Sequence, residues 1–252
     1  MRRIVPPVLA VLLGAAAPAQ GEPLTRDALQ LLATKYRFFI LIEPTGNKPL
    51  RYLYADQAQH LHVVAVKDGK SVPEWDSVGL GSPITSVFVK DVDADGKAEI
   101  LVSTLKGRVL AYDLNDYRLT FENMLRTFNT ITAMVPYNLD DDPQDEIIFI
   151  ADGRLQVYDA KSRREEWQTS ETYGATMVLV ANVDEDEQPE LILNTGVVID
   201  SRFRNVDFTV PGGFAARISL LDLNGDGIPE VVGETPEFPL RFFDLRNRRE
   251  IW

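Results

Sequence analysis

The sequence predicts an all-β fold, a β-propeller of about five four-stranded blades preceded by a short N-terminal helix. Three observations carry this prediction: an acidic nine-residue loop that recurs four times, short apolar runs on both sides of each copy, and little helical periodicity elsewhere. The loops begin at residues 91, 138, 182 and 222, so that successive copies are 47, 44 and 40 residues apart. A period of about 40–50 residues is typical of repeat architectures and suits a four-stranded blade.

Residues 1–19 are predicted to be an export signal. Arg2 and Arg3 form a basic region, residues 8–17 an apolar one, and Ala17-Pro18-Ala19 a small-x-small cleavage pattern, so we expect cleavage after Ala19. The apolar run is too short to span a bilayer, and no other segment reaches the required length of about twenty residues. The chain has no cysteine, which excludes thiolate metal sites and lipid attachment at the cleavage point. We therefore expect an exported bacterial protein, periplasmic or extracellular, without a transmembrane segment.

Residues 20–35 are predicted to contain the short helix. Thr25 suits its N-cap and Asp27 its first turn, and Ala28, Leu31 and Leu32 fall on one face. We expect this face to pack on one end of the propeller, and a helix that binds a partner is the alternative.

The propeller is assigned to residues 36–252, with repeats at about 36–83, 84–129, 130–174, 175–214 and 215–252. Each repeat holds β-branched or apolar runs bounded by Gly, Pro, Asn or Asp, which are strand signals. The first repeat lacks the acidic loop, as expected of a terminal repeat. Every repeat begins with its own first strand, so the ring would close through residues 24–35 or stay open and form a homo-oligomer. A β-sandwich with acidic turns is the alternative fold, but it does not require the loops to recur in register.

The recurring loop predicts calcium sites between the first and second strand of each repeat. Ca²⁺ takes six to eight hard oxygen ligands, and Asp, Asn or Glu occupies loop positions one, three, five and nine in every copy. The candidate ligands are Asp91, Asp93, Asp95 and Glu99; Asn138, Asp140, Asp142 and Glu146; Asn182, Asp184, Asp186 and Glu190; and Asp222, Asn224, Asp226 and Glu230. Position seven would add a backbone carbonyl. An Asp/Asn turn that hydrogen-bonds its own backbone and binds nothing is the alternative.

The four copies differ at position six. Gly96 and Gly227 in the first and fourth loops permit a left-handed backbone, so these two loops are the strongest candidates. Glu187 occupies that position in the third loop. Pro143 in the second loop forbids a positive φ, so the second loop must adopt another geometry or lack a metal.

These repeats resemble the FG-GAP and VCBS-type repeats of β-propellers, which are related to the calcium-bearing blades of integrin α-subunits. The family loop is D-x-[DN]-x-[DN]-G-x-x-[DE], and residues 222–230 match it throughout, whereas the other copies match at the ligand positions. The resemblance covers residues 84–252 well and 36–83 weakly, and the Phe-Gly and Gly-Ala-Pro signatures are poorly kept. It implies a secreted, calcium-stabilised propeller that binds proteins or glycans or accompanies a catalytic domain.

A weaker likeness links residues 157–167, which end on Trp167, to the Trp-docking repeats of quinoprotein propellers. Residues 66–75 and 242–252 repeat the pattern, ending on Trp75 and Trp252. The likeness implies a Trp that wedges between adjacent blades. It does not extend to a quinone site, because the residues that would surround the cofactor cannot be located and the adjacent-cysteine pair is missing.

Charge and motif content favour a binding module over an enzyme. The net charge of −12, about −14 once Arg2 and Arg3 are removed, argues against nucleic acids and anionic membranes as partners. No nucleophile or phosphate-binding motif appears, and His60 and His62, which would share one face of a strand, lack a third metal ligand. The favoured interpretation is a non-catalytic, calcium-stabilised module that binds a protein or glycan. The rival is an exported enzyme or quinoprotein-like cofactor binder that uses the central face of the ring.

Overall fold

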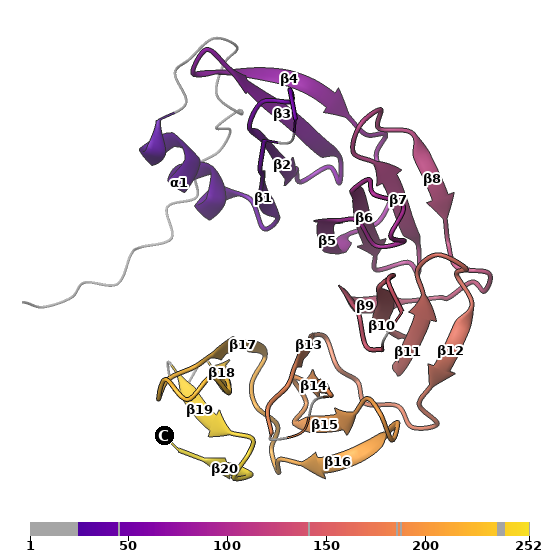
Figure 1. Cartoon of the computed structure of the whole chain (residues 1–252), viewed down its shortest axis with the longest axis vertical. Coiled ribbons are helices and arrows are strands. Elements are labelled where there is room, and N and C mark those ends of the chain that lie inside the picture. Colours follow the sequence, from indigo (N-terminus) through magenta and orange to yellow (C-terminus); the bar gives the residue numbers. More distant parts are fainter. Residues whose placement is uncertain are drawn as a thin grey trace, which may run out of the picture. The chain divides into compact units, whose positions relative to one another are not determined.

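The computed structural model describes residues 25–251 apart from residues 45, 141, 185, 187 and 236–239. These residues form one helix and twenty strands, arranged as five four-stranded antiparallel sheets (Figure 1). The predicted export signal, Glu187 and Trp252 lie outside the described residues. No helix within the described ranges has the length and apolarity of a membrane span. The chain divides into two compact units, residues 1–77 and residues 78–252.

The first unit contains the helix and one sheet. Its elements are α1 (Arg26–Lys35), β1 (Phe39–Ile42), β2 (Arg51–Ala55), β3 (Leu61–Lys67) and β4 (Lys70–Asp76). The strands pair in chain order, each with the next. Hairpin connections of this kind require only short turns, which the Asn, Asp and Gly residues between the runs supply.

Thr25 caps α1 as predicted, since its Oγ1 accepts a hydrogen bond from the Ala28 amide at 3.1 Å. The predicted apolar face is partly wrong. Leu32 is buried and Leu29 packs beside it against Tyr52, Tyr54 and Val64, but the side chain of Leu31 is 66% exposed. Leu29 and Leu32 are three residues apart and therefore share a helix face that Leu31 leaves.

The second unit contains four sheets of the same design, and again each strand pairs with the next in chain order. The first two sheets consist of β5 (Ile84–Lys90), β6 (Glu99–Thr104), β7 (Val109–Asp113) and β8 (Leu119–Glu122), then β9 (Ile131–Tyr137), β10 (Glu146–Ala151), β11 (Arg154–Asp159) and β12 (Glu165–Gln168). The last two consist of β13 (Val178–Ala181), β14 (Glu190–Leu193), β15 (Val197–Asp200) and β16 (Asn205–Thr209), then β17 (Arg217–Leu221), β18 (Glu230–Glu234), β19 (Arg241–Asp244) and β20 (Arg249–Glu250).

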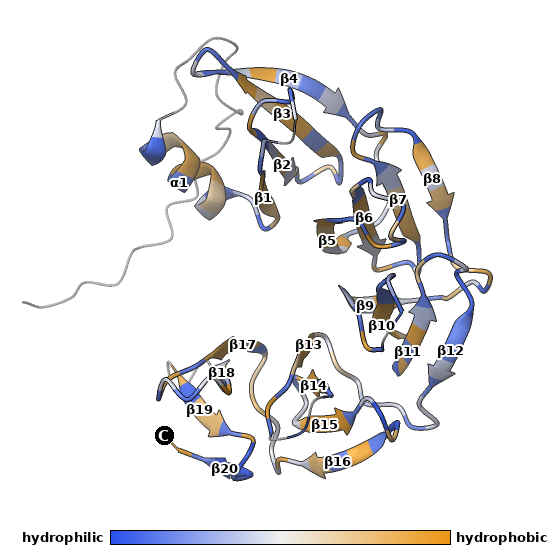
Figure 2. Cartoon of the chain, viewed as in Figure 1, coloured by the Kyte–Doolittle hydropathy of each residue, from blue (hydrophilic) through white to orange (hydrophobic). Residues whose placement is uncertain are grey.

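Successive sheets of the second unit contact one another through their first strands, β5 with β9, β9 with β13 and β13 with β17. Apolar clusters fill the space between sheets, and one of them joins Ile148 and Val157 to Val178 and Leu191 of the following sheet. Every residue of β6, β10 and β14 is buried. Strands covered on both faces need continuous apolar runs, which explains the β-branched segments after each loop. Figure 2 shows hydrophobic residues along β15 and a hydrophilic outer strand β12.

Aromatic residues on the fourth strands lie between sheets, as the Trp-docking likeness implies for Trp167. Its side chain is 9% exposed and belongs to the cluster that β13 and β14 share. An arginine from the following sheet covers each of three such rings: Arg163 over Phe121, Arg204 over Trp167 and Arg248 over Phe208, at 5.5, 5.9 and 4.9 Å from the ring centroid.

Candidate metal centres

All four acidic loops occupy the predicted place, between the first and second strands of the four sheets in the second unit. The glutamate at position nine is in each case the first residue of the second strand, namely Glu99, Glu146, Glu190 and Glu230. The rigid sheet therefore fixes the last ligand position, while the loop carries the others.

The four position-nine glutamates are buried, with exposed fractions of 5%, 0%, 3% and 4%. In each loop the backbone N–H of position two donates to glutamate Oε2, from Val92 at 3.1 Å, Leu139, Val183 at 2.9 Å and Leu223 at 2.8 Å. Each carboxylate is therefore turned back onto its own loop. No Lys, Arg or His neutralises these carboxylates through an ion pair that involves described residues.

Burial changes the acidity of these groups. Burial, together with the charges of nearby carboxylates and against the lowering effect of the backbone hydrogen bond, raises the pKa of Glu99, Glu146 and Glu190 to about 7. A divalent cation would favour the ionised form and offset the unfavourable burial of charge. The first three loops are thus poorly balanced electrostatically without a cation.

Asx-type hydrogen bonds shape all four loops in the same way. The N–H of position five donates to the side-chain Oδ1 of position three, at 3.1 Å in the first loop and 2.8 Å in the other three. The N–H of position seven donates to Oδ1 of position five, at 2.8, 3.2, 2.7 and 2.9 Å. These bonds occupy one oxygen of each aspartate side chain and the only side-chain oxygen of Asn224.

Position one divides the loops into two classes. In the first and fourth loops Oδ2 of Asp91 and Asp222 accepts the N–H of Gly96 and Gly227, at 3.0 and 2.9 Å, where φ is +85° and +88°. In the other two loops Asn138 and Asn182 instead donate Nδ2 to the position-five carbonyl. Pro143 has no N–H to donate, so an acceptor at position one would have no partner there. In the second loop, a donor at position one thus accompanies a position-six residue that cannot donate.

Three carboxylate clusters result, each with oxygens within 4.8 Å of one another. They are Asp91, Asp93 and Glu99; Asp140, Glu146 and Glu166; and Asp184, Asp186 and Glu190. Oδ1 of Asp91 and Oε1 of Glu146 are buried without a hydrogen-bond partner. Oxygen-only clusters of this charge suit a hard cation such as Ca²⁺ or Mg²⁺.

In the first and second loops the position-five aspartate stays outside the cluster. Lys97 Nζ lies 3.1 Å from Asp95 Oδ2 in the first loop, and the Gln144 side chain donates to Asp142 Oδ2 in the second. Glu166 of β12 joins the second cluster although it lies outside every acidic loop. Sequence reasoning missed Glu166, and its place on a fourth strand offered no local motif that could have indicated it.

The fourth loop, which matches the family pattern throughout, has a different interior. Asn224 Nδ2 donates to Asp226 Oδ2 at 3.0 Å and to Glu230 Oε1 at 3.1 Å, so an amide lies where a cation would. Both oxygens of Asp222 accept backbone N–H groups, from Gly225 and Gly227. A pocket of about 570 Å³ opens beside this loop, lined in part by Asn224, Glu230 and Arg249.

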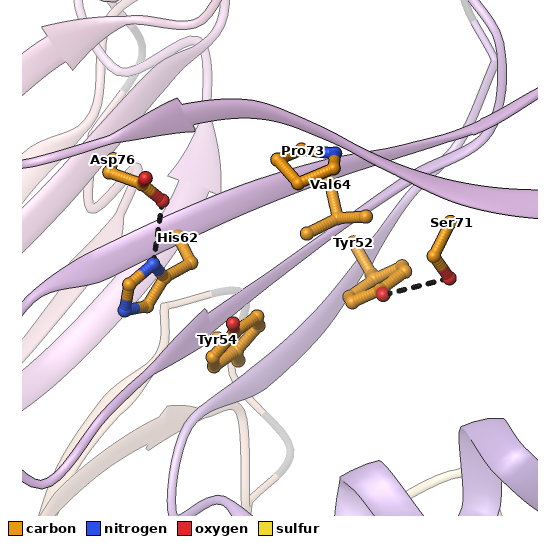
Figure 3. A pocket seen from close by; sticks show the side chains of 7 residues that line it. All are labelled: Tyr52, Tyr54, His62, Val64, Ser71, Pro73 and Asp76. Atoms are coloured by element: carbon orange, nitrogen blue, oxygen red, sulfur yellow. Dashed lines mark hydrogen bonds and ion pairs between the residues drawn. The ribbon is translucent and has the colours of Figure 1, made fainter. Parts of the chain in front are cut away.

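The first unit contains a separate pocket of about 190 Å³ (Figure 3). Its lining consists of Tyr52, Tyr54, His62, Val64, Ser71, Pro73 and Asp76. The Tyr52 hydroxyl donates to Ser71 Oγ at 3.1 Å, and the Tyr54 ring stacks on His62 with centroids 4.7 Å apart. The pocket offers aromatic faces and one carboxylate to a small ligand.

The two histidines lie side by side but face carboxylates. His60 immediately precedes β3 and His62 lies on it, with their ring centroids 6.2 Å apart. His62 Nδ1 is 2.6 Å from Asp76 Oδ1, and its Nε2 is 3.2 Å from Asp56 Oδ2, which also lies 3.3 Å from His60 Nδ1. Within the described ranges, neither histidine belongs to a cluster of three ligating side chains. That they bind no transition metal stays a prediction.

Comparison with known proteins identifies the fold but not a family. No protein-family model matches the chain, and no curated protein matches it in sequence. The chain is similar to a crystal structure of BBS1N in complex with ARL6DN, with 13% identity and a TM-score of 0.61 over 85% of this chain and 66% of that one. It is also similar to Sqt1 of Saccharomyces cerevisiae (12%, TM-score 0.55, 78% and 56%) and BamB of Moraxella catarrhalis (15%, TM-score 0.51, 80% and 57%).

These neighbours are β-propeller-like, and the chain spans between 56% and 66% of the length of their chains. The predicted fold class is therefore confirmed: the protein is all-β, with five four-stranded antiparallel blades and one short N-terminal helix. Identities this low concern the fold alone, because propellers of one architecture host unrelated functions.

Proposed function

We propose that the protein is an exported, calcium-stabilised propeller that acts as a non-catalytic scaffold and binds another protein. The observation that carries the proposal is the repeated loop with a buried, uncompensated glutamate at its base. Burying an unpaired carboxylate in each of four acidic loops costs folding free energy, unless a cation occupies at least some of the loops. The ions would act on stability and not on chemistry, since the loops lie between strands of single sheets.

The ligand inventory supports calcium over other cations. All the candidate donors are carboxylate, amide or carbonyl oxygens, and softer metals prefer sulfur or imidazole ligands over such oxygens. Magnesium demands a compact octahedral shell, whereas a flexible loop with three side chains and a carbonyl suits the larger ion. Extracellular modules typically bind calcium with a Kd of about 10⁻⁴–10⁻³ M, which agrees with the export predicted from residues 1–19.

A protein partner is supported by the architecture. Propeller blades present loops and strand edges over a broad, rigid surface, and one structural neighbour was crystallised as a complex with another protein, ARL6DN. The resemblance to FG-GAP and VCBS repeats implies proteins or glycans as ligands. The strongly acidic charge of the chain favours a basic face on that partner.

The proposal is tested in two steps on the mature chain. Calorimetric titration of the chelated protein with calcium should show saturable binding, with magnesium much weaker. The calcium-loaded protein is then screened against periplasmic or surface proteins and against a glycan array, with the chelated protein as control. Saturable binding to a glycan and to no protein would replace the partner class, and absence of calcium binding would overturn the stabilising role.

A further inference from the structure

The second acidic loop cannot use the ligands that its sequence positions suggest. Asn138 Nδ2 donates to the Asp142 carbonyl at 2.6 Å, and Asn138 Oδ1 accepts the Asp140 N–H at 3.2 Å. Asp142 accepts both the backbone N–H and the side-chain amide of Gln144. The side chains at positions one and five are therefore engaged in hydrogen bonds within the loop.

The same loop keeps an unsatisfied acceptor at its base. The side chain of Glu146 is fully buried, at 0% exposed, and its Oε2 accepts the Leu139 N–H. Its Oε1 is buried without a hydrogen-bond partner. A buried carboxylate oxygen in that condition is costly, and a cation beside it would remove the cost.

Glu166 supplies the carboxylate that positions one and five withhold. Oxygens of Asp140, Glu146 and Glu166 lie within 4.8 Å of one another, although Glu166 belongs to β12, the outer strand of the same sheet. The pairing of β11 with β12 shifts between Val157 and Tyr158, because Val157 pairs with Trp167 and Tyr158 with Glu165. Glu166 is the extra residue of this β-bulge, and bulges re-aim side chains.

The equivalent bulges in two other sheets of the second unit place different residues there. Thr120 lies between the paired residues Leu119 and Phe121, and Asp207 between Val206 and Phe208. The Thr120 hydroxyl donates to the Ala111 carbonyl, and Asp207 forms an ion pair with Arg248 at 2.8 Å. Neither is part of a carboxylate cluster among the described residues. Within the second unit, the contribution of Glu166 is therefore particular to the sheet whose loop contains Pro143.

We propose that the second loop holds a hard divalent cation, calcium, through a composite site of Asp140, Glu146 and Glu166, without Asn138 or Asp142 side-chain ligands. This inference rests on the proposed calcium binding and assigns the ligand set of one site. Occupancy would tie β12 to the loop between β9 and β10. The outer strand of this blade would thereby become calcium-dependent in its order.

The test compares three variants of the mature chain by calorimetric titration with calcium chloride after chelation. Glu166→Gln should lose one binding site or weaken it by about tenfold or more, the range seen when groups around a metal are altered. Glu165→Gln is the matched control, because it removes the same charge from the neighbouring residue. The Glu165 carboxylate contacts Tyr158 and Arg126 and is not part of the cluster. Glu165→Gln and Asp142→Asn should both retain the site.

A second measurement guards against misfolding and locates the site. In chelator, Glu166→Gln should melt no lower than the parent protein, because it removes one of three crowded negative charges. Calcium should slow amide hydrogen exchange in β12 of the parent protein but not of Glu166→Gln.

The outcomes are distinguishable from those of the proposed function. If the parent protein binds no calcium, both proposals fail. If it binds calcium and Glu166→Gln titrates like the parent, or Asp142→Asn abolishes the same site, only the composite site is overturned. An equal loss in Glu165→Gln would show a general charge effect and overturn it as well.

Discussion

Glu99 lies at the base of the first loop, where its Oε2 accepts the Val92 N–H at 3.1 Å and Asp91 and Asp93 lie beside it. Burial, followed by these two charges, raises its pKa from 4.5 to about 7, and burial raises the pKa of Glu146 and Glu190 to about 7 as well. Between pH 4.5 and 7 the folded chain thus holds protons that the unfolded chain has released. The free energy of unfolding of the metal-free protein therefore falls as pH rises through this window.

We expect the metal-free protein to melt at a higher temperature at pH 5.5 than at pH 8. Each tenfold change in proton affinity is worth about 1.4 kcal/mol, so one such glutamate costs on the order of 3 kcal/mol above pH 7. Glu99→Gln should stabilise the metal-free protein at pH 8 and reduce the pH dependence. In calcium the same variant should melt below the parent protein. Thermal unfolding in chelator and in calcium measures both effects, and a Glu99→Gln that melts lower in chelator at pH 8 would contradict them.

The spacing of Asp and Asn within each loop predicted the turns that the structure shows, because Asx turns are local. An Asp or Asn two residues before an amide forms the same hydrogen bond in all four loops, and the structure repeats it. Sequence reasoning ranked the first and fourth loops highest because of Gly96 and Gly227, but it could not show which side chains lie inside each loop. The Asn224 amide that lies across the fourth loop, and the Lys97 that pairs with Asp95 in the first, depend on side-chain orientation and not on spacing. Glu166 depends on a bulge twenty residues beyond Glu146.

At the scale of the elements, the turn between β6 and β7 depends on Gly107. Its φ is +76°, and a Cβ at this position would lie 2.0 Å from the Phe128 carbonyl oxygen in the connection to the next sheet. Gly96 has a similar φ of +85°, but open space surrounds it. A substitution at Gly96 would therefore cause backbone strain alone, whereas one at Gly107 would cause both strain and a steric clash.

Gly107→Ala should therefore destabilise the protein far more than Gly96→Ala. Strain from a positive φ costs about 1 kcal/mol, whereas a clash with backbone that cannot move aside adds roughly 2–3 kcal/mol. Urea unfolding in chelator measures both without the calcium contribution of the first loop. Equal losses in the two variants would show that the turn yields to the added methyl group.

Arginines also join neighbouring blades. Arg248 covers the Phe208 ring, and its Nη2 lies 2.8 Å from Asp207 Oδ1, both on β16 of the preceding sheet. The backbone of Arg248 has a positive φ of +53°. Arg163 and Arg204, at the equivalent turns of two other sheets, have φ values of +58° and +59°. Residues other than glycine rarely adopt a positive φ unless surrounding contacts compensate for the strain.

We expect Arg248→Ala to lower the free energy of unfolding by about 1 kcal/mol, from the lost ion pair and cation–π contact. Arg248→Gly should lose less, because glycine relieves the positive φ. Added salt should reduce the loss in both variants. Urea unfolding compares the two variants. If Arg248→Ala and Arg248→Gly both have the stability of the parent protein, Arg248 does not join the blades.

The elements themselves were largely predictable. Turn residues and β-branched runs alternate along the chain, and hairpin pairing needs no long-range information. The exposed Leu31 and the half-buried Leu29 of α1 were not predictable, because the helix face that becomes covered depends on which sheet residues the helix meets. The inter-blade arginines were missed because the sequence pattern shows a basic turn and not the ring that it covers.

At the scale of the whole molecule, each calcium ion would hold the first and second strands of one blade together, and this would recur in successive blades. The loops recur once per blade in the second unit, so each bound ion would stabilise one blade and, through the shared apolar clusters, its neighbours. An ion that binds only the folded chain stabilises it by about 2.7 kcal/mol at a hundredfold excess over Kd. The first unit lacks an acidic loop and should respond only indirectly.

The melting temperature of the mature protein, measured by calorimetry in chelator and over a series of calcium concentrations, tests the calcium account most directly. We predict a melting temperature that rises with calcium concentration, a much smaller rise with magnesium, and loss of part of the response in Asp93→Ala. Asp142→Ala, which removes an aspartate engaged by Gln144, should keep the response. A melting temperature that is the same in chelator and in calcium would show that the four loops are hydrogen-bonded turns without a metal, and would contradict the account.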